Sequence, residues 1–168
     1  NFYARLDALQ GESVEDALTR FKAWTATLPV DEDHEIGFEK VYDYDEDKDQ
    51  YDAVGWRTFY LRGKAELTGD MVRDAVAQAD QSDTGFGQWY VLMNMTPRGS
   101  EIFETITEAN VKKRFAIILD GKVESAPEIR EKIGGGTARI TMGAGGVQQQ
   151  QKDSKKLELV LRSGASTV

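Results

Sequence analysis

The sequence predicts an α+β fold, a two-layer sandwich in which helices cover a mainly antiparallel sheet. Along the 168 residues, segments with apolar side chains at helical spacing alternate with segments in which every second residue is apolar. The Asp120-Gly121 pair favours a two-residue hairpin turn. The chain is also long enough to bury a core without a metal or disulfide, and it contains no cysteine. A ferredoxin-like split βαβ unit is expected within residues 74–163.

The sequence of the N-terminal part predicts a loose arm or edge strand, followed by one helix. Residues 1–12 show no clear periodicity, whereas Ser13–Leu28 carries a continuous apolar stripe that ends before a proline. Ser13 and Asp16 form a variant of the capping box. Phe21 and Trp24 fit either a peptide-binding groove or the core, and core packing is the preferred interpretation.

Two strands, 35–42 and 54–61, are expected to pair as a long hairpin around an acidic loop at 43–52. Four tyrosines in this region suggest either ordinary cross-strand pairs or an exposed aromatic ridge, and cross-strand pairing is preferred. These residues are Tyr42, Tyr44, Tyr51 and Tyr60.

The acidic loop resembles a calcium site in composition but not in spacing. An EF-hand loop needs glycine at position 6 and glutamate at position 12. Counted from Asp43, those positions hold Lys48 and Val54, and counting from Asp45 fails in the same way. We therefore interpret this loop as a solvated hairpin tip, with calcium binding as the alternative.

The middle of the chain predicts a short helix and then a strand. Thr68-Gly69-Asp70 is a capping pattern for a helix at 69–75, and residues 76–87 suggest a short strand and a turn. Residues 88–95 alternate as a strand, in which Met93-Asn94-Met95 fits core packing better than a pliable binding surface.

The segment after residue 95 predicts a helix, a buried strand and a return strand. Thr96 is a natural N-cap, and Pro97 suits the first helical position. Phe115–Leu119 is an unbroken apolar run, typical of a strand covered on both faces. The return strand begins at Lys122, and Pro127 prevents further pairing.

The C-terminal part predicts a strand at 137–142, a flexible loop through the four glutamines 148–151, and a last helix. Asp153 or Ser154 is the expected cap of that helix, and Gly164 is suited to end it. The glycine-rich segments 134–136 and 143–146 are candidates for mobility.

Charge narrows the range of partners. The formal net charge is −8 and the isoelectric point is about 4.8. This balance argues against nucleic acid, which is bound through cations, and against anionic lipid surfaces. No apolar stretch approaches the 18 residues that a transmembrane helix needs.

The sequence offers no clear reaction centre. His34 is the only histidine and lies between two acidic residues in a charged segment. Carboxylates are so abundant, at 29, that no single pair is diagnostic of acid–base catalysis. Asp120 is explained by turn geometry. We expect no catalytic residue, no metal, no cofactor and no enzymatic activity.

Several motifs follow one another in a fixed order between residues 67 and 165. They are Leu67-Thr68-Gly69-Asp70, the glycines at 134–136 before Ala138-Arg139-Ile140-Thr141, and Leu161-Arg162-Ser163-Gly164-Ala165. The densest part lies between residues 107 and 129, where the structural motif positions are Thr107, Asn110, Arg114, Asp120, Gly121, Ser125 and Pro127. This ordered set resembles the periplasmic region of SecD, a membrane component of the bacterial Sec export machinery.

This resemblance implies a head-like part of the first periplasmic domain of a multi-pass inner-membrane protein. Residues 1–66 are expected to be a variable part and 67–165 the SecD-like core, together forming one compact domain excised from the longer protein. The implied function is to contact or hold preproteins that emerge from the SecYEG channel, with SecF as partner and the proton-motive force as energy source. The alternatives are a free-standing calcium- or ligand-binding domain, and a structural spacer between membrane spans.

Overall fold

The computed structural model confirms the α+β class, with helices packed on mainly antiparallel sheets. It describes residues 3–62, 66–81, 87–119, 121–142 and 146–162. The chain divides into two compact units. Unit 1 comprises residues 1–64 and 121–124, and unit 2 comprises residues 65–120 and 125–168. The expected assignment of 1–66 as a variable part and 67–165 as a core remains a prediction.

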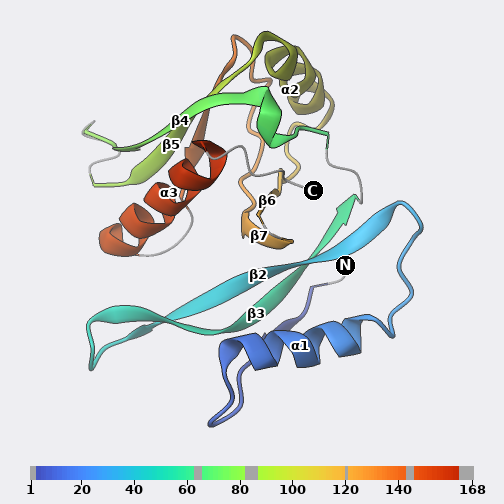
Figure 1. The fold of residues 1–168 in the computed structure, drawn as a ribbon, viewed down its shortest axis with the longest axis vertical. Helices are drawn as coiled ribbons and strands as arrows, with labels where there is room; N and C mark the ends of the chain where they lie inside the picture. Colours follow the sequence, from blue (N-terminus) through green and yellow to red (C-terminus); the bar gives the residue numbers. More distant parts are fainter. Residues whose placement is uncertain (1–2, 63–65, 82–86, 120, 143–145, 163–168) are drawn as a thin grey trace. The chain divides into compact units, whose positions relative to one another are not determined.

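Unit 1 is a twisted sheet with one helix on its face (Figure 1). Its elements are β1 (Arg5–Asp7), α1 (Val14–Thr25), β2 (His34–Asp45), β3 (Gln50–Arg62) and β7 (Lys122–Ser125). The strands lie in the order β1-β3-β2-β7. β3 pairs antiparallel with both β1 and β2, and β7 lies parallel to β2 through the Glu39–Val123 pair.

Helix α1 begins where the capping pattern predicts, since the Ser13 hydroxyl accepts a 3.0 Å hydrogen bond from the Asp16 N–H. Its inner face packs against β3, where Phe21 is buried and contacts the Phe38 ring edge-on at 5.6 Å. The prediction that Trp24 belongs to the core is wrong. Trp24 stacks on the outer side of Phe21 but stays 47% exposed, because the next inward position one turn after Phe21 is the buried Thr25.

The β2–β3 hairpin is confirmed, but it is longer than the sequence predicts. The ladder continues to the pair Asp45–Gln50, so most of the expected acidic loop is strand. Tyr44 and Tyr51 are direct cross-strand partners with ring centroids 5.3 Å apart. Aromatic pairing across the strands therefore extends the ladder through a sequence whose charge suggests a loop.

Unit 2 contains a three-stranded antiparallel sheet in the order β4-β5-β8. Its elements are the 3-10 turn η1 (Gly69–Met71), β4 (Val72–Ala79), β5 (Trp89–Met95), α2 (Pro97–Ala109), β6 (Ile117–Leu119), β8 (Thr137–Thr141) and α3 (Val147–Arg162). Figure 1 shows α3 running alongside β4 and β5. Within residues 74–163, β4 and β5 form a hairpin and β8 pairs antiparallel with β5, so β4 and β8 run parallel to each other with β5 between them.

A separate apolar core fills unit 2 between the sheet and the helices. The strands contribute alternate residues to it, and α2 and α3 contribute one stripe each. Its buried members are Ala75, Val91, Met93, Met95, Phe103, Ile117, Ala138, Ile140, Leu157 and Leu161. Met93 and Met95 thus fill the core, as the preferred interpretation predicts.

Three boundaries in unit 2 differ from the predictions. The helix expected at 69–75 is only the single 3-10 turn η1, after which β4 begins. The hydroxyl of Thr68 makes no capping bond to the turn and donates instead to the Asp70 carboxylate. The strand expected from Phe115 begins at Ile117, and α3 begins at Val147. Glutamines 148–151 are therefore helical, not a flexible loop, and Asp153 and Ser154 lie inside the helix.

Candidate functional site

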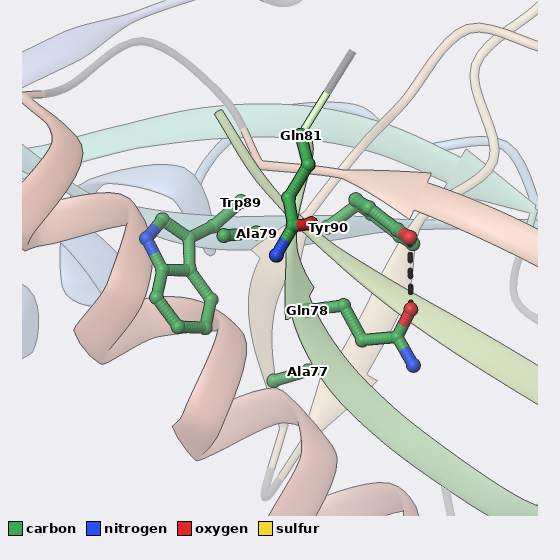
Figure 2. A pocket seen from close by; sticks show the side chains of 6 residues that line it. All are labelled: Ala77, Gln78, Ala79, Gln81, Trp89 and Tyr90. Atoms are coloured by element: carbon green, nitrogen blue, oxygen red, sulfur yellow. Dashed lines mark hydrogen bonds between the residues drawn. The ribbon is translucent and has the colours of Figure 1, made fainter. Parts of the chain in front are cut away.

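A hollow of about 460 Å³ opens beside the ends of β4 and β5 where these strands meet Gln81. Its walls combine two aromatic rings, two amide side chains and two methyl groups, which belong to Ala77, Gln78, Ala79, Gln81, Trp89 and Tyr90. Figure 2 shows Trp89 on the side of α3, and Tyr90 facing Gln78 on the other side of the strands. The Tyr90 hydroxyl donates a 2.8 Å hydrogen bond to the Gln78 amide oxygen.

Cations lie against both aromatic rings of the hollow. The ammonium of Lys155, from α3, lies 6.0 Å from the centre of the Trp89 ring. The guanidinium of Arg139, from β8, lies 3.8 Å from the centre of the Tyr90 ring and is paired with the Asp80 carboxylate. These contacts hold the rings in place through cation–π attraction, so the hollow has preformed aromatic walls.

The backbone around the hollow is fixed by side chains of α3. The Gln150 side-chain oxygen accepts a hydrogen bond of 3.2 Å from the Trp89 N–H. The Glu158 carboxylate accepts one of 3.1 Å from the Ala77 N–H. The register of β4 and β5, in which Ala79 lies opposite Trp89, then brings the methyl and indole groups to one end of the sheet.

The hollow is suited to binding rather than to a reaction. None of its six lining side chains is a carboxylate, a histidine or a nucleophile. Tyrosine, tryptophan and glutamine combine apolar surface with hydrogen-bonding groups, as peptide-binding surfaces do. Within the described ranges there is also no group of three acidic or histidine side chains that could hold a metal ion.

His34 is engaged in local contacts in unit 1. Its Nδ1 lies 2.7 Å from the Asp33 carboxylate, and its ring stacks on Tyr60 at 4.5 Å. The histidine bond lowers the pKa of Asp33. The Tyr60 hydroxyl in turn donates to Asp31 at 2.7 Å, which raises the pKa of Tyr60. No serine takes part in these contacts, so they do not form a catalytic triad.

The acidic hairpin tip carries its own cation. The Lys48 ammonium lies 2.7 Å from the carboxylates of both Asp45 and Asp52. These bonds raise the pKa of Lys48 and lower that of Asp45. A lysine therefore occupies the position between two carboxylates that a calcium ion would need.

The first motif residues of the 107–129 region organise the C-terminal end of α2. Thr107 is fully buried; its hydroxyl donates to the Phe103 carbonyl at 2.8 Å and accepts from the Ile133 N–H at 2.9 Å. Asn110 is the C-cap, and its side-chain N–H donates to the Ile106 carbonyl at 2.9 Å. Asn110 thus satisfies a carbonyl in the last turn of the helix, which the helix itself leaves open, and Thr107 satisfies the N–H of a residue outside the helix.

The later motif residues lie in a short stretch of paired backbone. Arg114 forms an isolated bridge with Glu128, and the Pro127 carbonyl accepts a 2.9 Å hydrogen bond from the Phe115 N–H. The named strand β7 ends at Ser125. The prediction that Pro127 prevents further pairing is wrong, because backbone pairing continues through the Pro127 carbonyl and the Glu128 bridge; proline lacks only the N–H donor.

The predicted turn joins β6 and β7. Gly121 has a φ of +71°, which a hairpin turn of this kind requires. Asp120 lies outside the described residues. The motif positions that the structure describes thus lie around backbone connections and do not line the hollow.

None of the predicted sites coincides with the hollow. The signal that was available is the adjacent pair Trp89-Tyr90 at the start of a strand. Alternation places neighbouring side chains on opposite faces of a sheet, so two adjacent aromatic residues cannot both enter the core. Their partners Ala77, Gln78 and Gln81 depend on β4, a strand that overlaps the expected strand at 76–87 only in part.

Comparison with known proteins gives a consistent result. A family model described as the SecDF P1 head subdomain matches residues 39–168. The chain is 42% identical to protein translocase subunit SecD of Anaeromyxobacter dehalogenans over 112 residues, which is 66% of this chain and 18% of that protein. It is 42% identical to protein translocase subunit SecDF of Thermus thermophilus over 106 residues, which is 63% of this chain and 13% of that protein. The matched region thus spans less than a fifth of either relative.

Solved structures also match. One, described as a membrane component SecDF that enhances protein export, is 39% identical, with a TM-score of 0.49, over 62% of this chain and 44% of that chain. Another, SecDF described as a translocon-associated membrane protein, is 22% identical, with a TM-score of 0.45, over 98% of this chain and 29% of that chain. In the part of the chain that the structure describes, no helix is long and apolar enough to cross a membrane.

Proposed function

Because this chain belongs to the family of SecDF P1 head subdomains, we propose that it contacts unfolded polypeptides as part of a protein-export translocase. The substrate is a preprotein that emerges from the SecYEG channel. The head subdomain holds it transiently during late translocation, which the proton-motive force drives. The observation that supports this proposal in the structure is the aromatic and amide hollow beside β4 and β5.

The chemistry of the hollow fits a partner whose sequence varies. Trp89 and Tyr90 offer flat apolar surface to any side chain, and Gln78 and Gln81 offer both donors and acceptors to a backbone. None of the six lining side chains carries a fixed charge, so their own contacts with a partner are apolar or hydrogen-bonded. Weak binding of many different segments is the expected behaviour.

The wider setting follows from the family. We propose that the chain lies on the periplasmic face of the inner membrane, within a multi-pass SecD-type protein that works with SecF and SecYEG. It needs no cofactor and catalyses no reaction. Its own role is mechanical, and the groups that carry protons belong to other parts of the full-length protein.

A second candidate function is a structural spacer that separates membrane segments without binding substrate. The two separate apolar cores favour it. Each unit packs helices against its own sheet, as a rigid spacer requires. The two functions differ in whether the hollow touches the export substrate.

Site-specific photocrosslinking in the full-length parent protein during export tests the proposal. A photoreactive residue at Gln78 or Gln81 is expected to crosslink to a preprotein arrested in transit. The matched control is the same residue at Trp24, an exposed aromatic position on α1 in unit 1. Equal crosslinking at all three positions, or none at Gln78 and Gln81, would contradict substrate contact at the hollow and favour the spacer.

A further inference from the structure

The outer edge of β8 differs from the edges at β4 and β1 in the hydrogen bonding of its backbone. In the β4-β5-β8 sheet, β8 is paired on one side only, with β5. The Met95 N–H donates to the Gly136 carbonyl at 2.8 Å, and the Met142 N–H donates to the Trp89 carbonyl at 3.2 Å. Antiparallel partners alternate between bonded and non-bonded pairs. The backbone N–H and C=O groups of Ala138 and Ile140 therefore also point toward β5.

The backbone groups of Thr137, Arg139 and Thr141 consequently point away from the sheet. All three residues are exposed. Among the residues that the structure describes, none accepts from or donates to these outward backbone groups. They form a row of donors and acceptors at the two-residue spacing of a β-strand.

The outer edge of β4 in the same sheet, in contrast to that of β8, is bonded to side chains of α3. The Ala77 N–H points away from β5 and is bonded to the Glu158 carboxylate of α3 at 3.1 Å. Beside it, the Arg162 guanidinium lies 3.3 Å from the Asp74 carboxylate. Side chains of α3 thus occupy this edge and oppose the addition of another strand.

The edge of β1 in unit 1 is also occupied. The Asp7 carbonyl points away from β3 and accepts a 3.3 Å hydrogen bond from the Arg20 guanidinium of α1. β1 is only three residues long as well. Short length and an intruding charge are two common ways in which proteins prevent edge pairing.

Within the part of the chain that the structure describes, β8 has none of these protections. Its sequence, Thr-Ala-Arg-Ile-Thr, contains no proline, and its pairing with β5 has no bulge. Its one charged side chain, Arg139, is bound to Asp80 and lies over the Tyr90 ring, which directs it across the sheet face and away from the open edge. Thr137 and Thr141, two residues before and after Arg139, favour the strand conformation.

We propose that β8 binds an extended polypeptide segment as an added fourth strand of the β4-β5-β8 sheet. This inference deepens the proposed function and rests on it, because the occupant is the unfolded export substrate. Backbone groups are the one feature that every unfolded chain shares, so an edge strand recognises a substrate independently of its sequence. Tyr90, which lies opposite Thr141 in the ladder and also lines the hollow, connects the two surfaces.

The small size of the edge favours this occupant over a second copy of the chain. A five-residue strand buries far less than the roughly 1,000 Å² that a specific dimer requires. It offers only a few hydrogen bonds, each of modest net strength, so contacts with it form and release easily. Such weak contacts suit a polypeptide that must be released during export.

Amide NMR titration of the 168-residue chain with two synthetic peptides tests the proposal. One peptide is Ser-Thr-Val-Thr-Val-Thr-Ser, and the other has the same side chains with alternate backbone nitrogens methylated. We expect the first to shift the amides of Thr137, Arg139 and Thr141, and the second to bind at least about tenfold more weakly because it lacks the backbone donors. Equal effects of the two peptides on these amides would overturn the proposal.

Two substitutions at Arg139 provide a second test of the proposal. Arg139→Pro removes an outward N–H without removing a bond to β5, whereas Arg139→Ala removes the same guanidinium and keeps the N–H. We expect Arg139→Pro to weaken binding of the first peptide at least about fivefold relative to Arg139→Ala. Equal affinities in two folded variants would overturn the proposal, and the methylated peptide tests it on the unaltered chain if the proline variant does not fold.

The outcomes separate this inference from the proposed function. If an unfolded preprotein shifts the amides of the hollow but never those of β8, edge pairing is wrong and substrate contact stands. If the preprotein shifts neither, both fail. If the β8 amides shift with the concentration of the chain itself and not with peptide, the occupant is a second copy, and the proposal is also wrong.

Discussion

The hydroxyl of Thr107 on α2 accepts a 2.9 Å hydrogen bond from the backbone N–H of Ile133, 26 residues further along the chain. Thr107 is fully buried and Ile133 is partly buried, so this bond takes the place of water for a backbone donor with restricted access to solvent. It joins the helix to the segment that leads into Gly134 and β8. The most distinctive sequence motif of the chain thus fixes a backbone connection in unit 2.

We predict that Thr107→Val lowers the free energy of unfolding of unit 2 by about 1–3 kcal/mol. The substitution keeps the shape of the side chain but leaves the Ile133 N–H without its acceptor. Thr107→Ser keeps the hydroxyl and is expected to cost only about 1 kcal/mol for the lost methyl group. Urea unfolding followed through unit 2 amides by NMR measures both. A serine variant as unstable as the valine variant would show that packing, not the hydrogen bond, is decisive.

In unit 1 we predict a large effect at Trp56. Its ring is completely buried, its Nε1–H donates to the Val14 carbonyl at 2.7 Å, and two lysine ammonium groups lie within 5.3 Å of its centre. Trp56→Phe removes the donor and leaves a cavity, so unit 1 should lose about 2–4 kcal/mol.

Trp24 provides the matched control for that substitution, because it is 47% exposed on the same unit. Trp24→Phe should change the stability of unit 1 by less than about 0.5 kcal/mol, as exposed substitutions usually do. Thermal unfolding of the two variants compares them directly. Similar losses for both tryptophans would contradict the core assignment.

The pH dependence of unit 1 should contain a contribution from Glu12. Hydrogen bonds from Arg20 and from the Leu9 N–H lower the pKa of Glu12 from 4.5 to about 2. A carboxylate whose pKa is lower in the folded state stabilises fully above its unfolded pKa and loses this contribution as the pH falls. The loss should therefore occur between about pH 4.5 and pH 2.

Glu12→Gln isolates this contribution, since the amide does not titrate. The melting temperature of unit 1 should fall less steeply in the variant than in the parent across that acid range. Arg20→Met, which removes the main partner, should give the same shallower dependence. Parallel melting curves for parent and variants would show that the ion pair carries no pH-dependent stability.

At Gly121 the predicted effect depends on backbone conformation alone. Its φ is +71°, and a Cβ there would meet nothing within 4 Å. Gly121→Ala should therefore cost about 1–2 kcal/mol from the left-handed conformation. Gly121→Asn should cost less, because asparagine tolerates that region. Chemical denaturation gives both values; an asparagine variant as unstable as the alanine variant would point to a steric cause.

Calcium should have no effect on the hairpin tip. Lys48 lies 2.7 Å from both Asp45 and Asp52, so a calcium ion would have to displace a bound ammonium. Titration calorimetry is expected to give no heat of binding, and calcium should not raise the melting temperature. Saturable heat together with a raised melting temperature would favour the alternative of a calcium-binding domain.

Local sequence signals predict α1, α2 and the β2–β3 hairpin because caps and periodicity agree there. They do not predict the start of α3. Toward the N-terminus from Leu157, the face of α3 that packs on the sheet is formed by Ser154 and Gln150. Those residues are polar, so a search for apolar periodicity places the helix start too late. Ser154 is nonetheless completely buried, and its hydroxyl donates to the Gln151 carbonyl.

The other differences arise from tertiary pairing. The capping pattern at Thr68 favours a helix, but the segment after Met71 pairs with β5 instead, and a ladder of strand bonds outweighs a weak local preference. The hollow cannot be predicted from the sequence for the same reason, because its lining depends on the register between β4 and β5. The family motifs, by contrast, are local and are found without the structure.

The most direct test of the central claim is amide NMR titration of this chain with an unfolded, export-competent preprotein. Contact with unfolded polypeptide predicts shifts that saturate and cluster at the hollow, including Gln78, Gln81 and Trp89, while Trp24 of unit 1 stays unchanged. Spectra that remain the same at every described residue, up to millimolar preprotein, would contradict it.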